Sequence, residues 1–361
     1  MNRIRDEAEL VELEDLGCVF SKEILWEAIP FVPGRSVGII EVFNVGITAI
    51  DGEKIPFPPN LHKALNNDLP DWVPLKSSLV SEFRPAFRGI VVALIRVFGR
   101  DKISRIYLAI SPNGLTDWKI YREPVFSPDE NDMRDWGYED VRIFYLPGIG
   151  FVITIVHYKN SSELGRVFRT ELWSTENFLS YQYISTMWPP FTKDVVLAEE
   201  LIDGKYVALV RPNIGDTQYI WRLESSDLIH WGEETIFLMS GMFPLLMTKV
   251  GCSGNISRMK NGGFKVPFHA VNNIEYANSF LGTDERLKRV THLPKTGLIG
   301  SEEGFHHVVG GYPQANFSCG QFIDEGTDSL LYYVGIADKE TRGKRMCQSR
   351  LEEDYILKSP V

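Results

Sequence analysis

Short apolar runs, separated by glycine, proline, asparagine or aspartate, recur along most of the chain and predict β-strands. One pair of runs is joined by Asp203-Gly204, a dipeptide typical of a tight hairpin. The runs that fit this description are residues 89–97, 103–111, 143–146, 151–157, 195–201, 206–210, 264–270, 276–281 and 329–335. The pattern predicts an all-β protein.

A polar turn that opens with serine and ends near an aromatic residue follows an apolar strand three times. The copies occupy residues 111–118, 174–181 and 225–231, at a spacing of about 50 to 63 residues. Strand pairs with such a turn at this period are typical of propeller blades, and residues 80–345 leave room for about five. A β-sandwich of similar strand content is the alternative. The recurring turn favours a five-bladed β-propeller.

The first 75 residues do not follow this rhythm. Residues 6–16 fit a short acidic helix, while 36–43 and 45–50 fit two strands. Residues 55–73 carry four prolines and are typical of a loop or arm on the surface. We therefore expect an N-terminal extension at 1–75 and the five-bladed propeller domain at 76–361.

Composition narrows the class of protein. The length of 361 residues exceeds the usual size of one domain, although large all-β folds also exceed it. A hydrophobic content of 44% with 24% charged residues is that of a soluble globular protein. The net charge of -10 disfavours nucleic acid or an anionic membrane as a partner, but still permits a local cationic pocket.

The cysteines and the N-terminus indicate the compartment. The four cysteines are widely spaced and form no CxxC pair, so neither a zinc site nor a disulfide framework is expected, and no metal motif is visible. The N-terminal residues are charged and lack the apolar stretch of a secretory signal, and no run of 18 apolar residues suggests a membrane span. We expect a cytoplasmic protein.

The stretch at residues 136–142 places two acids and a guanidinium at the start of an apolar strand. Strict alternation would put Glu139 and Val141 on one face, with Asp140 and Arg142 on the other. An acid beside a fixed cation keeps a defined charge, as a carboxylate that binds or protonates a substrate must. An ordinary ion pair at the end of a strand is the alternative.

Glu139-Asp140-Val141-Arg142 resembles the Glu-Asp-Pro-Arg signature of glycoside hydrolase family 130, which groups inverting β-mannoside phosphorylases with related hydrolases on a five-bladed propeller. Four further stretches resemble the family's motifs in the family's order. They are residues 193–212, similar to its long segment that opens with a cation and ends in Arg-Pro, Ile220-Trp221 with residues 225–231, residues 251–254 with Phe268-His269, and residues 332–338. The resemblance covers roughly residues 80–340.

The resemblance implies roles for individual residues. Asp140 would be the catalytic acid, acting through a sugar hydroxyl, and the phosphate of a phosphorylase would be bound by Lys193, Arg211 and His269. Substrate contacts would come from Arg96, with Arg105 in the following Ser-Arg-Ile, from Glu139 and Arg142 of the signature, and from Asp338. Taken singly, Lys193 also fits a solvated lysine, Arg211 a structural ion pair, and His269 a core histidine.

These residue types suit inverting phosphorolysis of a β-mannoside or related oligosaccharide. Phosphate is the nucleophile, so one proton donor and a few cations suffice, and the only cosubstrate expected is inorganic phosphate, with no cofactor. An inverting hydrolase instead needs a second carboxylate roughly 6.5–9.5 Å from the acid, for which Glu199 or Glu200 is the candidate. A sugar-binding propeller without catalysis is the third alternative.

The chain also departs from the family pattern. Val141 replaces the signature's proline, Ala270 replaces a glycine, and Ala198 stands where the family has Phe-Pro. The family's Asn-Pro-Gly corresponds to Arg84-Pro85-Ala86 in this reading, which puts one sugar contact in doubt. We expect a distant branch of the family, in which the proline-rich arm at 55–75 is a candidate for bridging subunits of a homo-oligomer.

Overall fold

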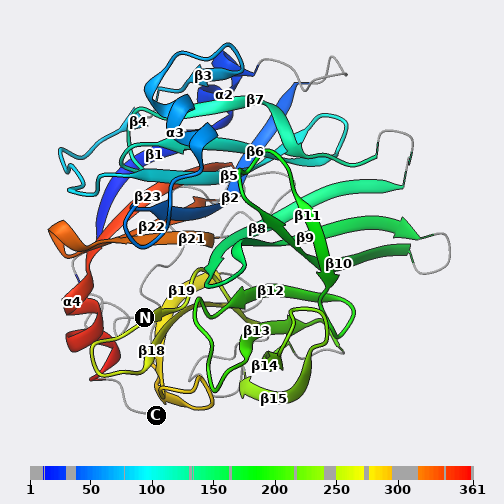
Figure 1. The fold of residues 1–361 in the computed structure, drawn as a ribbon, viewed down its shortest axis with the longest axis vertical. Helices are drawn as coiled ribbons and strands as arrows, with labels where there is room; N and C mark the ends of the chain where they lie inside the picture. The colour runs from blue at the N-terminus through cyan, green and yellow to red at the C-terminus, as the bar shows by residue number, and fades with distance from the viewer. Residues whose placement is uncertain are drawn as a thin grey trace.

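The computed structural model describes residues 11, 13–29, 38–76, 78–129, 132, 134–161, 165–214, 218–239, 249–271, 276–294, 316–336 and 339–358. The described chain is mostly β-strand, as predicted (Figure 1). Its helical segments are short: α2 (Lys22–Ala28), α3 (Pro59–Asn66), α4 (Gln348–Arg350), η2 (Glu325–Thr327) and η3 (Leu351–Ile356).

The strands form five antiparallel units, in each of which four strands pair in a row. The first two units are β2 (Ile39–Ile50), β5 (Ile90–Gly99), β6 (Ser104–Ser111), β7 (Lys119–Phe126), and β8 (Asp135–Leu146), β9 (Gly150–Ser161), β10 (Gly165–Thr175), β11 (Gln182–Thr186). The third is β12 (Thr192–Leu197), β13 (Tyr206–Pro212), β14 (Ile220–Ser225), β15 (Gly232–Leu238). The last two are β16 (Lys249–Cys252), β18 (Phe264–Val271), β19 (Tyr276–Thr283), β20 (Val290–His292), and β21 (Asn316–Asp324), β22 (Ser329–Ile336), β23 (Glu340–Cys347), β1 (Glu14–Ser21).

The units are arranged so that their first strands meet. Strand β2 lies against β8 and β21, and β12 lies against β8 and β16. The first two units also touch through one parallel pair, Ser104 with Gly137, which joins them into a single sheet. Three minor strands pair with these units: β3 (Trp72–Pro74) with β7, β4 (Ser78–Leu79) with β1, and β17 (Ser257–Arg258) with β18. Residues far apart in sequence are thereby brought to the middle of the molecule.

The recurring polar turn occupies the same place in three consecutive units. It joins β6 to β7, β10 to β11, and β14 to β15. In each copy a hydroxyl accepts a backbone N–H three residues on, from Ser111 to Gly114, Thr175 to Phe178, and Ser225 to Leu228. Such side-chain caps stabilise a tight turn. The repeat seen in the sequence is therefore a structural repeat.

The N-terminal segment differs in part from its prediction. Strands β1 and β2 lie within residues 1–75, yet β1 pairs with β23 (Figure 1) and β2 pairs with β5. The helix expected at 6–16 is wrong for Glu14–Leu16, which belong to β1, and residues 6–10 lie outside the described part. The proline-rich segment is not all loop, because Pro59 opens helix α3 at a position where a missing N–H costs nothing.

The apolar positions form contiguous cores between the units. The largest cluster joins strands β8 to β19 around residues such as Val195, Leu209 and Phe264.

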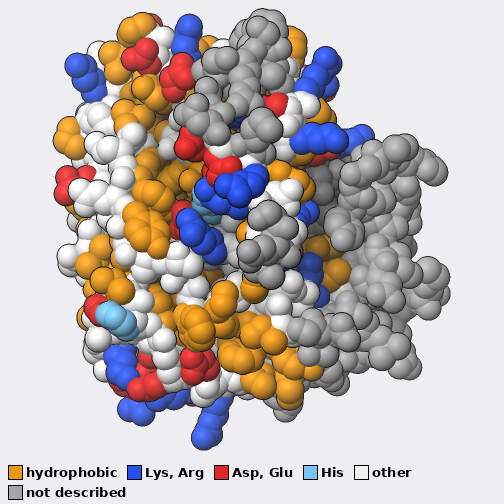
Figure 2. Space-filling model, turned by 90° about the vertical axis from the view of Figure 1, so that its right-hand side faces the viewer, with side chains coloured by type: hydrophobic (Ala, Val, Ile, Leu, Met, Phe, Trp, Pro, Cys, Tyr) orange, Lys and Arg blue, Asp and Glu red, His pale blue; other side chains and the backbone are white. Residues whose placement is uncertain are grey.

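Figure 2 shows one face of the molecule, on which acidic, basic and histidine side chains lie side by side near the middle. Among the described residues no helix is long and apolar enough to cross a membrane. The four cysteines are unpaired.

Candidate active site

Glu139 and Asp140 both point into the same polar cluster, which the alternation argument did not allow. Strand β8 carries a bulge here, because Glu139 faces Val156 while Arg142, three residues on, faces Thr154. Asp140 sits in the bulge with a positive φ of 53°. A bulge inserts one residue and re-aims the side chains around it. The prediction that Asp140 and Arg142 form a side-chain pair on one face is therefore wrong.

Two cations, Arg96 and Lys193, hold the two carboxylates together. Arg96 Nη2 lies 2.5 Å from Glu139 Oε2 and its Nη1 lies 3.4 Å from Asp140 Oδ1. Lys193 Nζ lies 2.8 Å from Glu139 Oε1 and 3.9 Å from Asp140 Oδ2. Burial raises the pKa of Glu139, but Arg96 and Lys193 outweigh it and lower this pKa to about 2. Glu139 is therefore ionised at neutral pH and anchors both cations.

Asn44 contacts the predicted acid directly, since its Nδ2 donates to Asp140 Oδ1 at 2.7 Å. Asn44 lies in a bulge of β2 with a φ of 51°, a conformation that asparagine tolerates well. Arg84, by contrast, is exposed and bonds to nearby carbonyls. Arg84 therefore does not reach the predicted acid in the structure, whereas Asn44, followed by Val45 and Gly46, does.

Arg142 is buried behind the acid and organises the backbone. Its guanidinium donates to the carbonyls of Ser253, Cys252 and Asp140 at 3.1, 3.0 and 3.1 Å. Only 1% of its side chain is exposed, so a sugar does not reach it directly in this arrangement. Arg142 is therefore placed to position the β8 bulge against β16.

Asp194, which the sequence argument missed, is the anionic centre of the deeper part of the cluster. Its Oδ2 accepts from Arg211 Nε at 2.6 Å and lies 3.4 Å from His269 Nε2, and its Oδ1 lies 3.5 Å from Arg142 Nη2. Burial opposes ionisation, but Arg211, His269 and Arg142 outweigh it and hold the pKa of Asp194 well below its usual value. The available signal was its position directly after Lys193.

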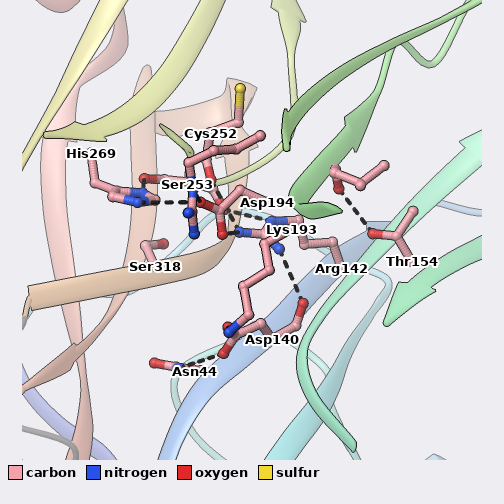
Figure 3. A network of polar contacts seen from close by, with 12 residues as sticks. Asn44, Asp140, Arg142, Thr154, Lys193, Asp194, Cys252, Ser253, His269 and Ser318 are labelled. Atoms are coloured by element: carbon pink, nitrogen blue, oxygen red, sulfur yellow. Dashed lines mark hydrogen bonds and ion pairs between the residues drawn. The ribbon is translucent and has the colours of Figure 1, made fainter. Parts of the chain in front are cut away.

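His269 is fully buried in β18. Burial lowers its pKa to about 4, against the opposing effect of Asp194, so the ring is neutral at pH 7. Its Nδ1 lies 3.3 Å from the hydroxyl of Ser253 (Figure 3). The predicted phosphate contact would therefore be a hydrogen bond from a neutral imidazole and not an ion pair.

Lys249, at the start of β16, is a second residue that the sequence argument missed. Its Nζ donates to Tyr276 Oη at 2.7 Å, and Arg211, Asp194, Lys193 and Asp140 are close enough to act on its charge. Burial, helped by Arg211, lowers the pKa of Lys249 to about 8. Among the described residues no carboxylate forms an ion pair with it, whereas Lys193 pairs with Glu139 and Asp140, and Arg211 pairs with Asp194.

A cavity of about 630 Å³ opens beside Arg96 and Glu139, within the size range of ligand sites. Arg105 is on the opposite face of β6, where it pairs with Asp101 at 2.8 Å and does not join the cluster. Asp338 lies outside the described residues. The structure thus brings Arg96, Glu139, Asp140, Arg142, Lys193, Arg211 and His269 together.

The two candidate base residues have other partners. Glu199 accepts the backbone N–H of Tyr145 at 2.8 Å, and Glu200 pairs with Arg258 at 2.8 Å. Burial raises the pKa of Glu199 to about 7. Neither contacts Asp140, whose partners among the described residues are Asn44, Arg96 and Lys193. Within the described ranges, no group of three or more histidines, cysteines and acids is placed to hold a metal ion.

The comparisons with known proteins agree with this geometry. No protein-family model matches the chain. It is similar to a 1,2-β-oligomannan phosphorylase of Thermoanaerobacter sp. (strain X514), with 27% identity over 65% of this chain and 76% of that protein. It is also similar to a β-1,4-mannooligosaccharide phosphorylase of Ruminococcus albus, with 25% identity over 70% of this chain and 76% of the relative.

Two solved structures share the fold. One is the complex of a β-1,2-mannobiose phosphorylase from Listeria innocua with β-1,2-mannobiose, at a TM-score of 0.64 and 20% identity, covering 90% of this chain and 94% of the other. The second belongs to work on the GH130 family of mannoside phosphorylases, which contains glycoside hydrolases that target β-1,2 linkages in Candida mannan. Its TM-score is 0.65 at 15% identity, over 97% of this chain and 95% of the other.

Proposed function

Since the chain belongs to glycoside hydrolase family 130, we propose that it cleaves a β-mannoside by inverting phosphorolysis, with inorganic phosphate as cosubstrate. The observation that carries the proposal is the position of Asp140. Its carboxylate contacts Asn44, Arg96 and Lys193. Lys193 also lies near a second group of side chains, which consists of Arg211, Lys249 and His269.

In the proposed reaction, a phosphate oxygen forms a bond to the anomeric carbon as the bond from that carbon to the leaving oxygen breaks. Asp140, protonated before the step, supplies the proton for the leaving oxygen, relayed through a sugar hydroxyl. The products are mannose 1-phosphate of inverted configuration and the shortened sugar. Because phosphate is itself the nucleophile, no carboxylate base is needed.

The charge of the cluster suits a bound anion. Its described residues include five cations, Arg96, Arg142, Lys193, Arg211 and Lys249, and three acids, Glu139, Asp140 and Asp194. With Asp140 protonated as the proposed donor and His269 neutral, the cations exceed the ionised carboxylates by three. Lys249 lacks a carboxylate partner in the described part of the cluster and completes the set of Lys193, Arg211 and His269. A dianionic phosphate would offset most of this excess positive charge.

We assign the sugar to the side of Arg96 and Glu139, which line the cavity. The amide oxygen of Asn44 is buried without a hydrogen-bond partner among the described residues, and a sugar hydroxyl would satisfy it. Asp338 stays a predicted sugar contact. The proposal drops Arg105, whose guanidinium is held by Asp101.

Hydrolysis by the same site is the second candidate function. It needs a base opposite Asp140, and Glu199, whose pKa burial raises to about 7, is the candidate among the described residues. Its hydrogen bond to Tyr145 and the cationic surroundings of Asp140 favour phosphorolysis. A non-catalytic sugar-binding protein would not require the buried cationic group.

We further propose that the five units are the blades of a five-bladed propeller. The meeting of their first strands and the repeated turn support this arrangement. Strand β1 would then close the last blade from the N-terminal side. The division at residue 75, a cytoplasmic location and a homo-oligomeric state stay predictions.

The experiment incubates the protein with β-1,2- and β-1,4-mannobiose, with and without millimolar phosphate. Mannose 1-phosphate that forms only with phosphate, and that is lost in Asp140→Asn, would support the proposal. Free mannose at equal rates in both conditions would make the protein a hydrolase. Binding of sugar without turnover, unchanged in Asp140→Asn, would point to the sugar-binding alternative.

A further inference from the structure

Strand β8 carries another bulge, between Asp135 and Gly137, which turns Trp136 out of the ladder. Gly137 has a φ of 87°, and a Cβ there would lie 1.9 Å from the carbonyl oxygen of Ser104. Only glycine fits so close an approach. Glycine at residue 137 is thus required by the contact between the first two units.

Buried polar residues fix this bulge from behind. Asp135 Oδ1 accepts the N–H of Gly137 at 2.9 Å, and both Asp135 oxygens lie 3.0 Å from His157 Nε2. His157 Nδ1 in turn lies 3.0 Å from Glu171 Oε1. A residue held by several buried hydrogen bonds keeps its direction. Trp136 is therefore presented by a rigid backbone.

Trp136 lines the same cavity as Arg96 and Glu139, but at a more open place. It is 39% exposed, while Glu139 is 6% exposed. The guanidinium carbon of Arg166 lies 5.4 Å from the centroid of the Trp136 ring and 4.2 Å from that of Tyr158. Lys193 lies 4.7 Å from the same Tyr158 ring, so one continuous wall leads from Trp136 to the acid.

We propose that Trp136 and Arg166 form the platform for the leaving sugar of the mannoside and thereby determine which acceptor the protein accepts. This inference rests on the proposed function. The apolar C–H face of a pyranose packs against the electron-rich face of an indole, and a guanidinium donates to the hydroxyls at its rim. The mannosyl unit lies deeper, beside Arg96 and Asp140. The outer position of Trp136 therefore matches the sugar that departs.

The test measures the two directions of the reaction separately. In synthesis from mannose 1-phosphate, Trp136→Ala should raise the KM for mannose as acceptor by about tenfold, the size of one lost aromatic contact with its buried area. In phosphorolysis, the same Trp136→Ala variant should change the KM for phosphate by less than about twofold. Trp136→Phe should restore most of the acceptor affinity. Trp188→Ala is the matched control, because Trp188 is 55% exposed and does not line the cavity.

Arg166→Met tests the second half of the platform without touching the bulge and should also raise the acceptor KM. The proposal is overturned if Trp136→Ala leaves the acceptor KM at the control value, or if it raises the KM for phosphate equally. If the wild type shows no phosphorolysis, the proposed function fails. Calorimetric titration with mannobiose then tests whether Trp136 and Arg166 still bind the sugar. Binding that is about tenfold weaker in Trp136→Ala than in Trp188→Ala supports it, and equal binding rejects it.

Discussion

Replacing Asp194 by asparagine should destabilise the protein strongly. Asp194 is 1% exposed and is the shared partner of Arg211 at 2.6 Å and Arg142 at 3.5 Å. Asparagine has nearly the same shape but no charge, so two buried guanidinium groups would lose their counterion. Removal of one partner from a buried ion pair costs about 3–5 kcal/mol, since the remaining charge stays buried.

This loss of folding free energy corresponds to a lower melting temperature, Tm. With an unfolding entropy of about 2.1 cal/mol/K per residue over 361 residues, 1 kcal/mol corresponds to roughly 1.3 °C. Asp194→Asn should therefore lower Tm by about 4–7 °C. The same substitution at Asp203, 48% exposed and 3.6 Å from Arg286, should lower Tm by at most about 1 °C.

Differential scanning calorimetry of the wild type and both variants at pH 7 would measure these shifts. A lowering of Tm in Asp194→Asn no larger than in Asp203→Asn would refute the reasoning, because it would mean that Arg142 and Arg211 do not depend on this carboxylate. A large shift would establish that Asp194 stabilises the folded protein by neutralising the buried cations Arg142 and Arg211.

Three further results are expected. The KM for phosphate should rise as the pH passes through about 8, where Lys249 loses its proton, and Lys249→Arg should remove that step; a wild-type profile without the step would count against Lys249 as a phosphate ligand. Glu199→Gln should leave the ratio of mannose 1-phosphate to free mannose unchanged in product analysis, and a selective loss of free mannose would instead identify Glu199 as a hydrolytic base. For His157, burial lowers the pKa but Asp135 and Glu171 raise it above its usual value, so its stabilisation is full below the unfolded pKa of about 6.5 and is lost as pH rises through the folded pKa. The Tm difference between wild type and His157→Gln should accordingly be larger at pH 6 than at pH 9, and an equal difference at both would show that the charge of His157 does not matter.

Much of the fold follows from local sequence signals. Strand periodicity located most of the long strands, and the serine-led turns marked the third connection of three units because a hydroxyl cap depends only on residues within the turn. The N-terminal strands were harder to place. The pairing of β1 with β23 joins residues more than 300 positions apart, and nothing local to either strand specifies its partner.

The candidate site could be predicted only where side chains alternate regularly along their strands. Arg96, Lys193 and Glu139, which the resemblance named as candidates, lie together in the structure. Asp140 and Asn44 reach one another through bulges that a period of two does not predict. Asp194 and Lys249 carry no motif of their own, and their role appears only once β12 and β16 lie side by side. Arg105 shows the converse, because its guanidinium pairs with Asp101 and does not join the cluster.

The bulges also explain why valine can stand where the family pattern has proline. In both segments the unusual backbone conformation is at the preceding residue, Asn44 or Asp140, whose φ is positive. The close approach is supplied by Gly46, where a Cβ would lie 2.6 Å from the carbonyl oxygen of Val141. A positive φ at Asn44 or Asp140, together with the close approach at Gly46, defines the bulge. A proline ring at the following residue is therefore not needed to hold it. Val141 in place of the signature's proline is therefore compatible with the contact of Asn44 with Asp140, and with the geometry on which the proposed acid depends.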